Sequence, residues 1–170
     1  MVYEPREDSF LLQKFVKIHA RGKVLDVGTG SGIQALTAVE NTKDVTAVDS
    51  NPEAVAVARA KGIHAFESDL FSAVQGTFDC IIFNPPYLPK EEGYDELAIT
   101  GGKYGYEILE RFFKEAKQFL NKDGKMLIVF STITGDIEFL LRQHGYVFEK
   151  LGEESFFFEK VFVYLIKRSE

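Results

Sequence analysis

The chain has 170 residues, 45% of them hydrophobic, which fits a single domain, residues 1–170, built around one sizeable core. The formal net charge of −6 and a pI near 5.2 argue against a protein that grips nucleic acid through its whole surface. One cysteine, three scattered histidines and no long apolar run give no sign of a disulfide, a metal site or a membrane span, so we expect a cytoplasmic protein.

Short apolar runs alternate with helical segments along the chain, which is typical of a parallel sheet with helices on both faces. The predicted helices are Glu7–Ala20, Gln34–Glu40, Asn51–Ala60, Tyr106–Leu120 and Ile137–Gln143. The predicted strands are Lys23–Val27, Val45–Val48, Gly62–Glu67, Phe78–Phe83 and Met126–Phe130, with Tyr146–Lys150 and Phe156–Ile166 as a closing antiparallel pair. We interpret the run Phe156-Phe157-Phe158 as strand core rather than as a ligand-binding box. Pro86–Gly105 is a long loop, and connections of that length are usually functional or disordered.

The motif Asn84-Pro85-Pro86-Tyr87 follows the apolar strand Phe78–Phe83. Two successive prolines cannot donate to a sheet ladder, so the chain must leave the sheet here as a stiff, extended segment. Such a loop presents an amide side chain, backbone carbonyls and an aromatic ring, which can bind and stack on a flat, uncharged NH2 group. A strand-ending turn with an internally bonded Asn84 is the alternative, but the four-residue combination favours a site.

A glycine-rich loop follows the first predicted strand, with Gly28, Gly30 and Gly32 at alternate positions. Alternate glycines let the backbone turn tightly and approach a ligand. Ile33 occupies the place where a dinucleotide loop has a small residue, so the spacing predicts a small nucleotide-like ligand and disfavours a nicotinamide-dependent oxidoreductase.

Two carboxylates end the next two strands. Asp49 lies 21 residues after Gly28, where an acid can accept both hydroxyl protons of a ribose; a helix cap ahead of Pro52 is the alternative. Asp69 and Leu70 offer an acceptor for an exocyclic amine beside an apolar wall, although this pair fits an ordinary structural role equally well.

The predicted ligand therefore has a ribose and an adenine-like base, and it needs little phosphate neutralisation because residues 26–33 contain no Lys or Arg. Asp26, at the start of the glycine loop, would repel a phosphate and attract an ammonium group. S-adenosylmethionine meets each condition, since it has an amino group, a sulfonium cation and no phosphate.

Taken together, these motifs resemble the class I S-adenosylmethionine-dependent methyltransferases that act on planar nitrogen. The N-terminal segment Val2–Leu12 narrows the likeness to the short HemK-type protein-glutamine methyltransferases of archaea and eukaryotes, which modify the Gly-Gly-Gln loop of a class 1 release factor. Later segments fit the same branch: Asp69-Leu70-Phe71, Leu88-Pro89 and Gly101-Gly102-x-x-Gly105. The likeness covers essentially the whole chain and departs at Lys61-Gly62, where many relatives carry an Asn and a longer segment.

The resemblance implies a Rossmann-like α/β fold whose seven-stranded, mostly parallel sheet has the order 3-2-1-4-5-7-6, with the last strand antiparallel and helices on both faces. It also implies a set of cofactor contacts, namely Ser9, Asp26, Gly28, Asp49, Asp69, Leu70 and Asn84. The glutamine would be handled by Asn84, Pro85 and Tyr87. The loop chemistry adds Gly30 and Gly32 to the cofactor site and gives Pro86 the task of keeping the loop rigid.

The favoured function is transfer of a methyl group to a side-chain amide nitrogen of a protein, with the release-factor glutamine as substrate. One alternative is an N6-adenine methyltransferase on DNA or RNA, which the acidic charge and the lack of a target-recognition domain disfavour. A second alternative is a non-catalytic S-adenosylmethionine-binding subunit. Relatives of this branch bind a small zinc-containing activator protein. We expect Gly62–Glu67 to lie at the open edge of the sheet and to receive such a partner through strand addition.

Overall fold

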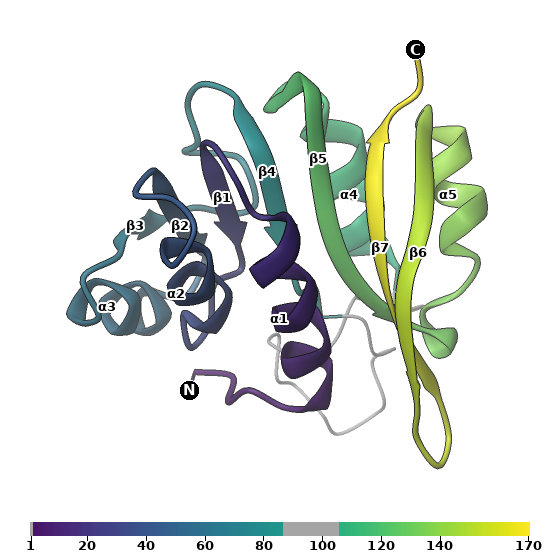
Figure 1. The fold of residues 1–170 in the computed structure, drawn as a ribbon, viewed down its shortest axis with the longest axis horizontal. Helices are drawn as coiled ribbons and strands as arrows, with labels where there is room; N and C mark the ends of the chain where they lie inside the picture. The colour runs from purple at the N-terminus through teal and green to yellow at the C-terminus, as the bar shows by residue number, and fades with distance from the viewer. Residues whose placement is uncertain (1, 87–105) are drawn as a thin grey trace.

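The computed structural model describes residues 2–86 and 106–170, and within them a seven-stranded sheet runs through the centre of the molecule (Figure 1). The strands are β1 Val24–Val27, β2 Val45–Asp49, β3 His64–Glu67, β4 Phe78–Phe83, β5 Leu120–Ser131, β6 Tyr146–Ser155 and β7 Lys160–Arg168. Their order is β3-β2-β1-β4-β5-β7-β6, and β7 is antiparallel to both of its neighbours. The predicted strand order and the antiparallel last strand are confirmed.

Helices cover both faces of this sheet (Figure 1). Side chains of α1 (Glu7–His19), α2 (Ile33–Val39) and α3 (Pro52–Ala60) pack on one face, and those of α4 (Glu107–Ala116) and α5 (Ile137–Gln143) pack on the other. A short 3-10 helix, Thr132–Thr134, follows β5. Among the described residues, no helix is both long and apolar enough to cross a bilayer.

Alternate residues of the central strands supply the two cores. In β4, Cys80 and Ile82 belong to the cluster beneath α1, α2 and α3, whereas Ile81 and Phe83 belong to the cluster beneath α4 and α5. Both sets are at most 2% exposed, which is why a parallel strand in this position is apolar along its whole length.

The core beneath α4 braces the strand that carries Asn84. Leu109, Phe112 and Phe113 are at most 1% exposed, and their three- and four-residue spacing places them on one face of α4. The ring of Phe112 stacks on that of Phe83 with centroids 4.5 Å apart, so the last residue of β4 has a fixed position.

Three predicted boundaries were wrong. Leu120 begins β5 rather than ending a helix, because α4 ends at Ala116 and the following residues turn into the strand. Strand β6 continues to Ser155, where it pairs with Lys160 of β7. Consequently residues 156–159 make the hairpin turn, and the phenylalanine run is not strand core: Phe156, Phe157 and Phe158 are 38%, 93% and 88% exposed.

Candidate functional site

Two adjacent parallel strands bring the glycine loop and the Asn84 motif together. Val27 of β1 is the register partner of Phe83 in β4, so Gly28 and Asn84 leave the sheet side by side at its carboxyl edge. Val48 of β2 pairs with Val27 from the other side, which brings Asp49 to the same edge. The strand order reverses between β1 and β4, and in open α/β sheets ligands bind at this switch point.

The glycine loop adopts the left-handed backbone that its composition allows. Gly28, Gly30 and Gly32 have φ angles of 63°, 51° and 81°. A Cβ atom at Gly28 would lie 3.4 Å from the ring of Phe83, in tight contact with it. The three glycines are thus required by the backbone, because each has a positive φ that other residues rarely adopt.

Asp26 lies beneath this loop and is 1% exposed. Its Oδ2 accepts hydrogen bonds from the Thr29 hydroxyl at 2.7 Å and from the Ala35 N–H at 3.2 Å, which ties the loop to the first turn of α2. Burial raises the pKa of Asp26 to about 7, and the two hydrogen bonds oppose that rise. These bonds give Asp26 a structural task, and its direct contact with a cofactor stays a prediction.

Asp49 is partly exposed at the end of β2 and faces the glycine loop. One carboxylate oxygen accepts from the Gly30 N–H and the other from the Asn51 N–H, both at 2.9 Å. The cap of α3 is Asn51, whose side chain accepts from the Glu53 N–H at 2.9 Å, so the alternative role predicted for Asp49 is filled by another residue. Each oxygen of Asp49 keeps a lone pair for a ligand hydroxyl.

The turn after β3 carries an unusual backbone. Leu70, which is 6% exposed, has a φ of 50° and is the one non-glycine residue with a positive φ in the described part of the chain. The Ser68 hydroxyl holds this turn by donating to the Leu70 carbonyl at 2.8 Å and accepting from the Ala73 N–H at 3.0 Å. Such conformations persist only where the surroundings enforce them, often at ligand sites.

Asp69 is exposed beside this turn, and the sequence prediction missed its partner. Arg111, from α4, donates to the Asp69 carboxylate at 2.9 Å. The arginine is close only in the folded chain, 42 residues away in sequence. The Asp69 carboxylate therefore takes part in a surface ion pair, and its contact with a cofactor stays a prediction.

Asn84 is held by residues from the beginning of the chain. Its Nδ2 donates to Asp8 Oδ2 at 3.4 Å and to Ser9 Oγ at 3.2 Å. Asp8 also accepts from the Ser9 N–H at 2.7 Å and from the Tyr3 hydroxyl at 3.2 Å. These bonds engage the amide nitrogen of Asn84, and its Oδ1 can act only as a hydrogen-bond acceptor.

Asp8 is therefore a site residue that the sequence analysis missed. The sequence places Asp8 only within the predicted helix Glu7–Ala20 and gives it no role, but it is only 4% exposed. Burial, followed by the charge of Asp8, raises the pKa of the Tyr3 phenol, which keeps its proton for this bond. The available signal was an acidic residue adjoining Ser9, which was itself predicted to lie in the site.

The proline motif is described up to Pro86. Pro85 is buried and Pro86 is half-buried, which fits the predicted stiff exit from the sheet. Tyr87 lies outside the described residues, as do Leu88-Pro89 and the glycines at 101, 102 and 105.

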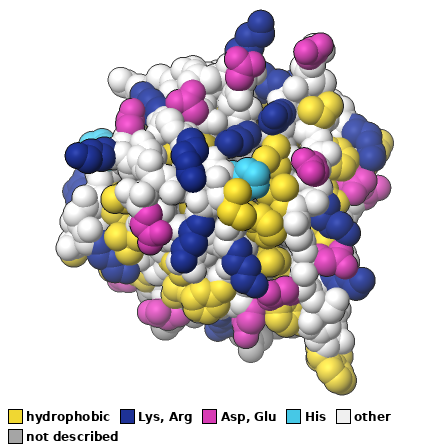
Figure 2. All heavy atoms as spheres, in the orientation of Figure 1, with side chains coloured by type: hydrophobic (Ala, Val, Ile, Leu, Met, Phe, Trp, Pro, Cys, Tyr) yellow, Lys and Arg dark blue, Asp and Glu magenta, His cyan; other side chains and the backbone are white. Residues whose placement is uncertain are grey.

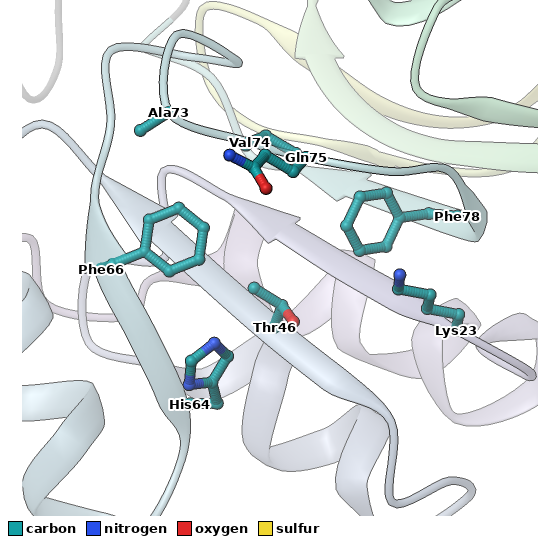
Figure 3. A pocket seen from close by; sticks show the side chains of 8 residues that line it. All are labelled: Lys23, Thr46, His64, Phe66, Ala73, Val74, Gln75 and Phe78. Atoms are coloured by element: carbon teal, nitrogen blue, oxygen red, sulfur yellow. The ribbon is translucent and has the colours of Figure 1, made fainter.

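A hollow of about 400 Å³ lies beside the beginnings of β3 and β4 (Figure 3). Phe66, Val74 and Phe78 give it an apolar wall, and Lys23, which precedes β1, borders it. His64 begins β3 and Phe78 begins β4, and the residues that line this hollow do not include Gly28, Asp49 or Asn84.

Comparison with known proteins agrees with this arrangement. The family model described as the methyltransferase small domain matches residues 7–157. The chain belongs to the methyltransferase small domain family. It is a HemK-type member of the class I methyltransferases, and S-adenosylmethionine is its methyl donor.

Two relatives and one solved structure illustrate the likeness. A Methanocaldococcus jannaschii protein, named as a protein N5-glutamine methyltransferase, is 43% identical over 149 residues, which cover 81% of this chain and 76% of that relative. The mouse methyltransferase HEMK2 is 33% identical over 75% of this chain and 71% of its own length. The Mtq2 chain of the E. cuniculi Mtq2–Trm112 complex, which methylates the termination factor eRF1, has a TM-score of 0.82 and 26% identity, with 99% of both chains covered.

The residues at the carboxyl edge of this methyltransferase fit its methyl donor. The three glycines carry no side chains that would keep a ligand from their backbone, Asp49 keeps lone pairs suited to ribose hydroxyls, and residues 26–33 contain no cation for a phosphate. Asp8 and Asp49 make this edge acidic, which suits a sulfonium and an ammonium group.

Proposed function

We propose that this methyltransferase modifies the side-chain amide nitrogen of a protein glutamine, the one in the Gly-Gly-Gln loop of a class 1 release factor. The observation that carries the proposal is the orientation of the Asn84 side chain, whose amide nitrogen donates hydrogen bonds to Asp8 and Ser9. Its oxygen is left to accept from an uncharged NH2 group. The names of the M. jannaschii relative and of the E. cuniculi complex support glutamine and a termination factor as the target.

The task of the loop is to orient a poor nucleophile. The lone pair of an amide nitrogen is delocalised into its carbonyl group, so the nitrogen must be held in the geometry of attack. Asn84 Oδ1 and the Pro85 carbonyl accept its two N–H bonds, and Pro86 keeps the loop rigid.

Orientation of this kind supplies roughly 7–11 kcal/mol of a reaction barrier. When bound, S-adenosylmethionine supplies an electrophilic methyl group on a sulfonium. Transfer is direct and in line, and no covalent enzyme adduct forms. The proton leaves the methylated nitrogen afterwards without a dedicated base, because a nitrogen that has gained a fourth bond is strongly acidic.

The cofactor contacts that we propose are those of the predicted set. Gly28, Gly30 and Gly32 let the backbone approach the amino-acid part, and Asp49 accepts from the ribose hydroxyls. The remaining proposed contacts are the acidic, polar and apolar groups around them, namely Ser9, Asp26, Asp69, Leu70 and Asn84. We place the enzyme in the cytoplasm, where translation factors act.

Labelled S-adenosylmethionine tests the reaction. The wild-type enzyme is expected to label the release factor, but not a release factor whose Gly-Gly-Gln glutamine is replaced by alanine, nor duplex DNA or RNA. Label on adenine instead would establish the N6-adenine alternative, and no label on any of them would overturn the proposal.

The variant Asn84→Ala tests the mechanism. Turnover should fall by orders of magnitude, while cofactor affinity stays within about tenfold, since positioning and cofactor binding are separate tasks. Asn84→Asp should also be poor, because its carboxylate would face that of Asp8 in a partly buried site. Near-normal turnover by Asn84→Ala would show that the loop does not hold the substrate.

A small zinc-containing activator protein is proposed to dock at β3. This strand is at the edge of the sheet, and Phe66 points from it into the hollow of Figure 3. Arg59 of α3 donates to the Ala65 carbonyl at 2.7 Å, so an added strand must exchange or accommodate that bond. The E. cuniculi structure supports the proposal because Mtq2 is in complex with Trm112 there.

Co-purification tests this partner. Phe66→Asp should abolish the complex, whereas Ile18→Asp, at a side chain 60% exposed near the end of α1, should leave it intact. An enzyme whose activity is complete alone and ignores the added activator would contradict the proposal.

A further inference from the structure

The tip of the β6–β7 hairpin exposes a pair of aromatic rings. Phe157 is 93% exposed and Phe158 is 88% exposed, and their rings meet edge to face with centroids 4.7 Å apart. Figure 1 shows the hairpin extending beyond the rest of the sheet, and hydrophobic side chains form the matching protrusion at the lower right of Figure 2. Phe157 and Phe158 are called the hairpin tip below.

Neither the turn nor the core explains these residues. The Phe156 N–H donates to the Glu159 carbonyl at 2.8 Å, which closes the hairpin around Phe157 and Phe158. Central positions of tight turns favour Gly, Asn, Asp and Pro, and large apolar side chains are stabilising only when buried. Paired exposed aromatics that break both rules mark a contact surface.

The sheet register places the hairpin tip over the active edge. Phe83, which precedes Asn84, pairs with Ile128 of β5, and Ile128 pairs with Tyr164 of β7. Strand β7 is thus two strand spacings from β4, about 10 Å sideways. From Tyr164 back to Lys160 the hairpin extends about 13 Å further in the direction in which β4 ends, and the tip lies beyond Lys160. A protein that brings a glutamine to Asn84 therefore has its neighbouring surface in reach of the tip.

The charge around the hairpin tip selects among possible occupants. Residues 149–160 contain four glutamates and two lysines, so this hairpin is anionic. Anionic lipids and nucleic acids would be repelled by it, whereas an apolar patch on a protein would not.

We propose that the hairpin tip docks the protein substrate, with Phe157 and Phe158 packing against an apolar surface that flanks the reactive glutamine. This inference rests on the proposed function and adds a second contact to it, remote from the reacting atoms. The tip supplies affinity for the intact substrate, while Asn84 and Pro85 orient the amide.

Steady-state kinetics with the double variant Phe157→Ser/Phe158→Ser tests the inference. KM for the intact release factor should rise at least tenfold, while kcat and cofactor affinity stay within about twofold. A short peptide containing Gly-Gly-Gln should be methylated equally by both enzymes, since it cannot span from Asn84 to the tip. The variant Phe157→Leu/Phe158→Leu, which keeps an apolar tip, should restore most of the affinity.

A matched control is Val147→Ser, an apolar residue that is 52% exposed on β6 at the other end of the sheet; it should change nothing. Unchanged KM in the double variant, with an active wild-type enzyme, would overturn the hairpin role alone. A wild-type dimer that the double variant converts to a monomer would identify a second copy as the occupant and overturn it as well. Absence of wild-type turnover on the release factor would overturn the proposed function together with this occupant.

Discussion

Asp8 is predicted to act through Asn84, and its removal should impair catalysis more than cofactor binding. Asp8 is 4% exposed and accepts from the Tyr3 hydroxyl, the Ser9 N–H and Asn84 Nδ2. In Asp8→Ala these donors lose a charged acceptor, and the Asn84 amide keeps only its hydrogen bond to Ser9 Oγ. With one of its two anchors gone, the Asn84 oxygen would be held less firmly toward the substrate.

The magnitude follows from the bonds lost. A hydrogen bond to a charged group contributes about 1.5–3 kcal/mol, which corresponds to roughly 10–150-fold in rate if the whole effect lies in orienting Asn84. We therefore expect kcat of Asp8→Ala on the release factor to fall by about that factor. Asp8→Asn keeps one acceptor oxygen and should lose less. Glu7→Gln, at the exposed neighbouring position, is the control and should behave as wild type.

A double-mutant cycle separates positioning from a general loss of structure. If Asp8 works through Asn84, then Asp8→Ala should have almost no further effect on turnover in an Asn84→Ala background. Calorimetry with S-adenosylhomocysteine should show binding within a few-fold of wild type in both single variants. Strictly additive effects on kcat, or an Asp8→Ala enzyme with normal turnover, would refute the positioning role.

Three further predictions concern the loop and the core. Asp49→Ala should weaken S-adenosylmethionine binding about tenfold or more by calorimetry while the fold survives, and unchanged affinity would remove Asp49 from the site. Burial raises the pKa of Asp26 from its ordinary 3.8 to about 7, so the folded state binds this proton more tightly than the unfolded chain does. The contribution of Asp26 to the free energy of unfolding therefore falls as the pH rises from about 4 to 7. Asp26→Asn has no group that titrates at this position. The Tm of Asp26→Asn minus the Tm of the wild type should therefore increase from about pH 4 to pH 7 and stay level above pH 7. A difference in Tm that does not change with pH would contradict the raised pKa of Asp26. Phe112→Ala deletes a ring that is 0% exposed and should lower the free energy of unfolding, measured in urea, by about 3–5 kcal/mol. Phe157→Ala should change it by no more than about 0.5 kcal/mol. Similar losses in both variants would show that the hairpin tip is packed in solution.

The local pattern of residues was enough to predict the layered α/β architecture. A strand buried on both faces must be apolar throughout, and an amphipathic helix must repeat its apolar residues every three or four positions, so β4 and α4 were recognisable from periodicity alone. The order of the strands came from the family resemblance and was confirmed. Glycines at alternate positions likewise predicted a tight backbone turn, and all three have the positive φ angles that glycine adopts readily.

What the sequence could not predict depends on contacts between distant segments. Asp8 and Asn84 are 76 residues apart, and nothing in either local pattern shows that one holds the other. The same is true of Arg111 and Asp69. The phenylalanine run was wrongly assigned to a strand for a related reason. Apolar character favours burial, but the β6–β7 register decides where the turn falls, and that register is a property of the pair of strands. Local residues therefore determined which chemistry the edge of the sheet offers, and the tertiary structure decided which side chains hold it in place and which remain exposed to meet a partner.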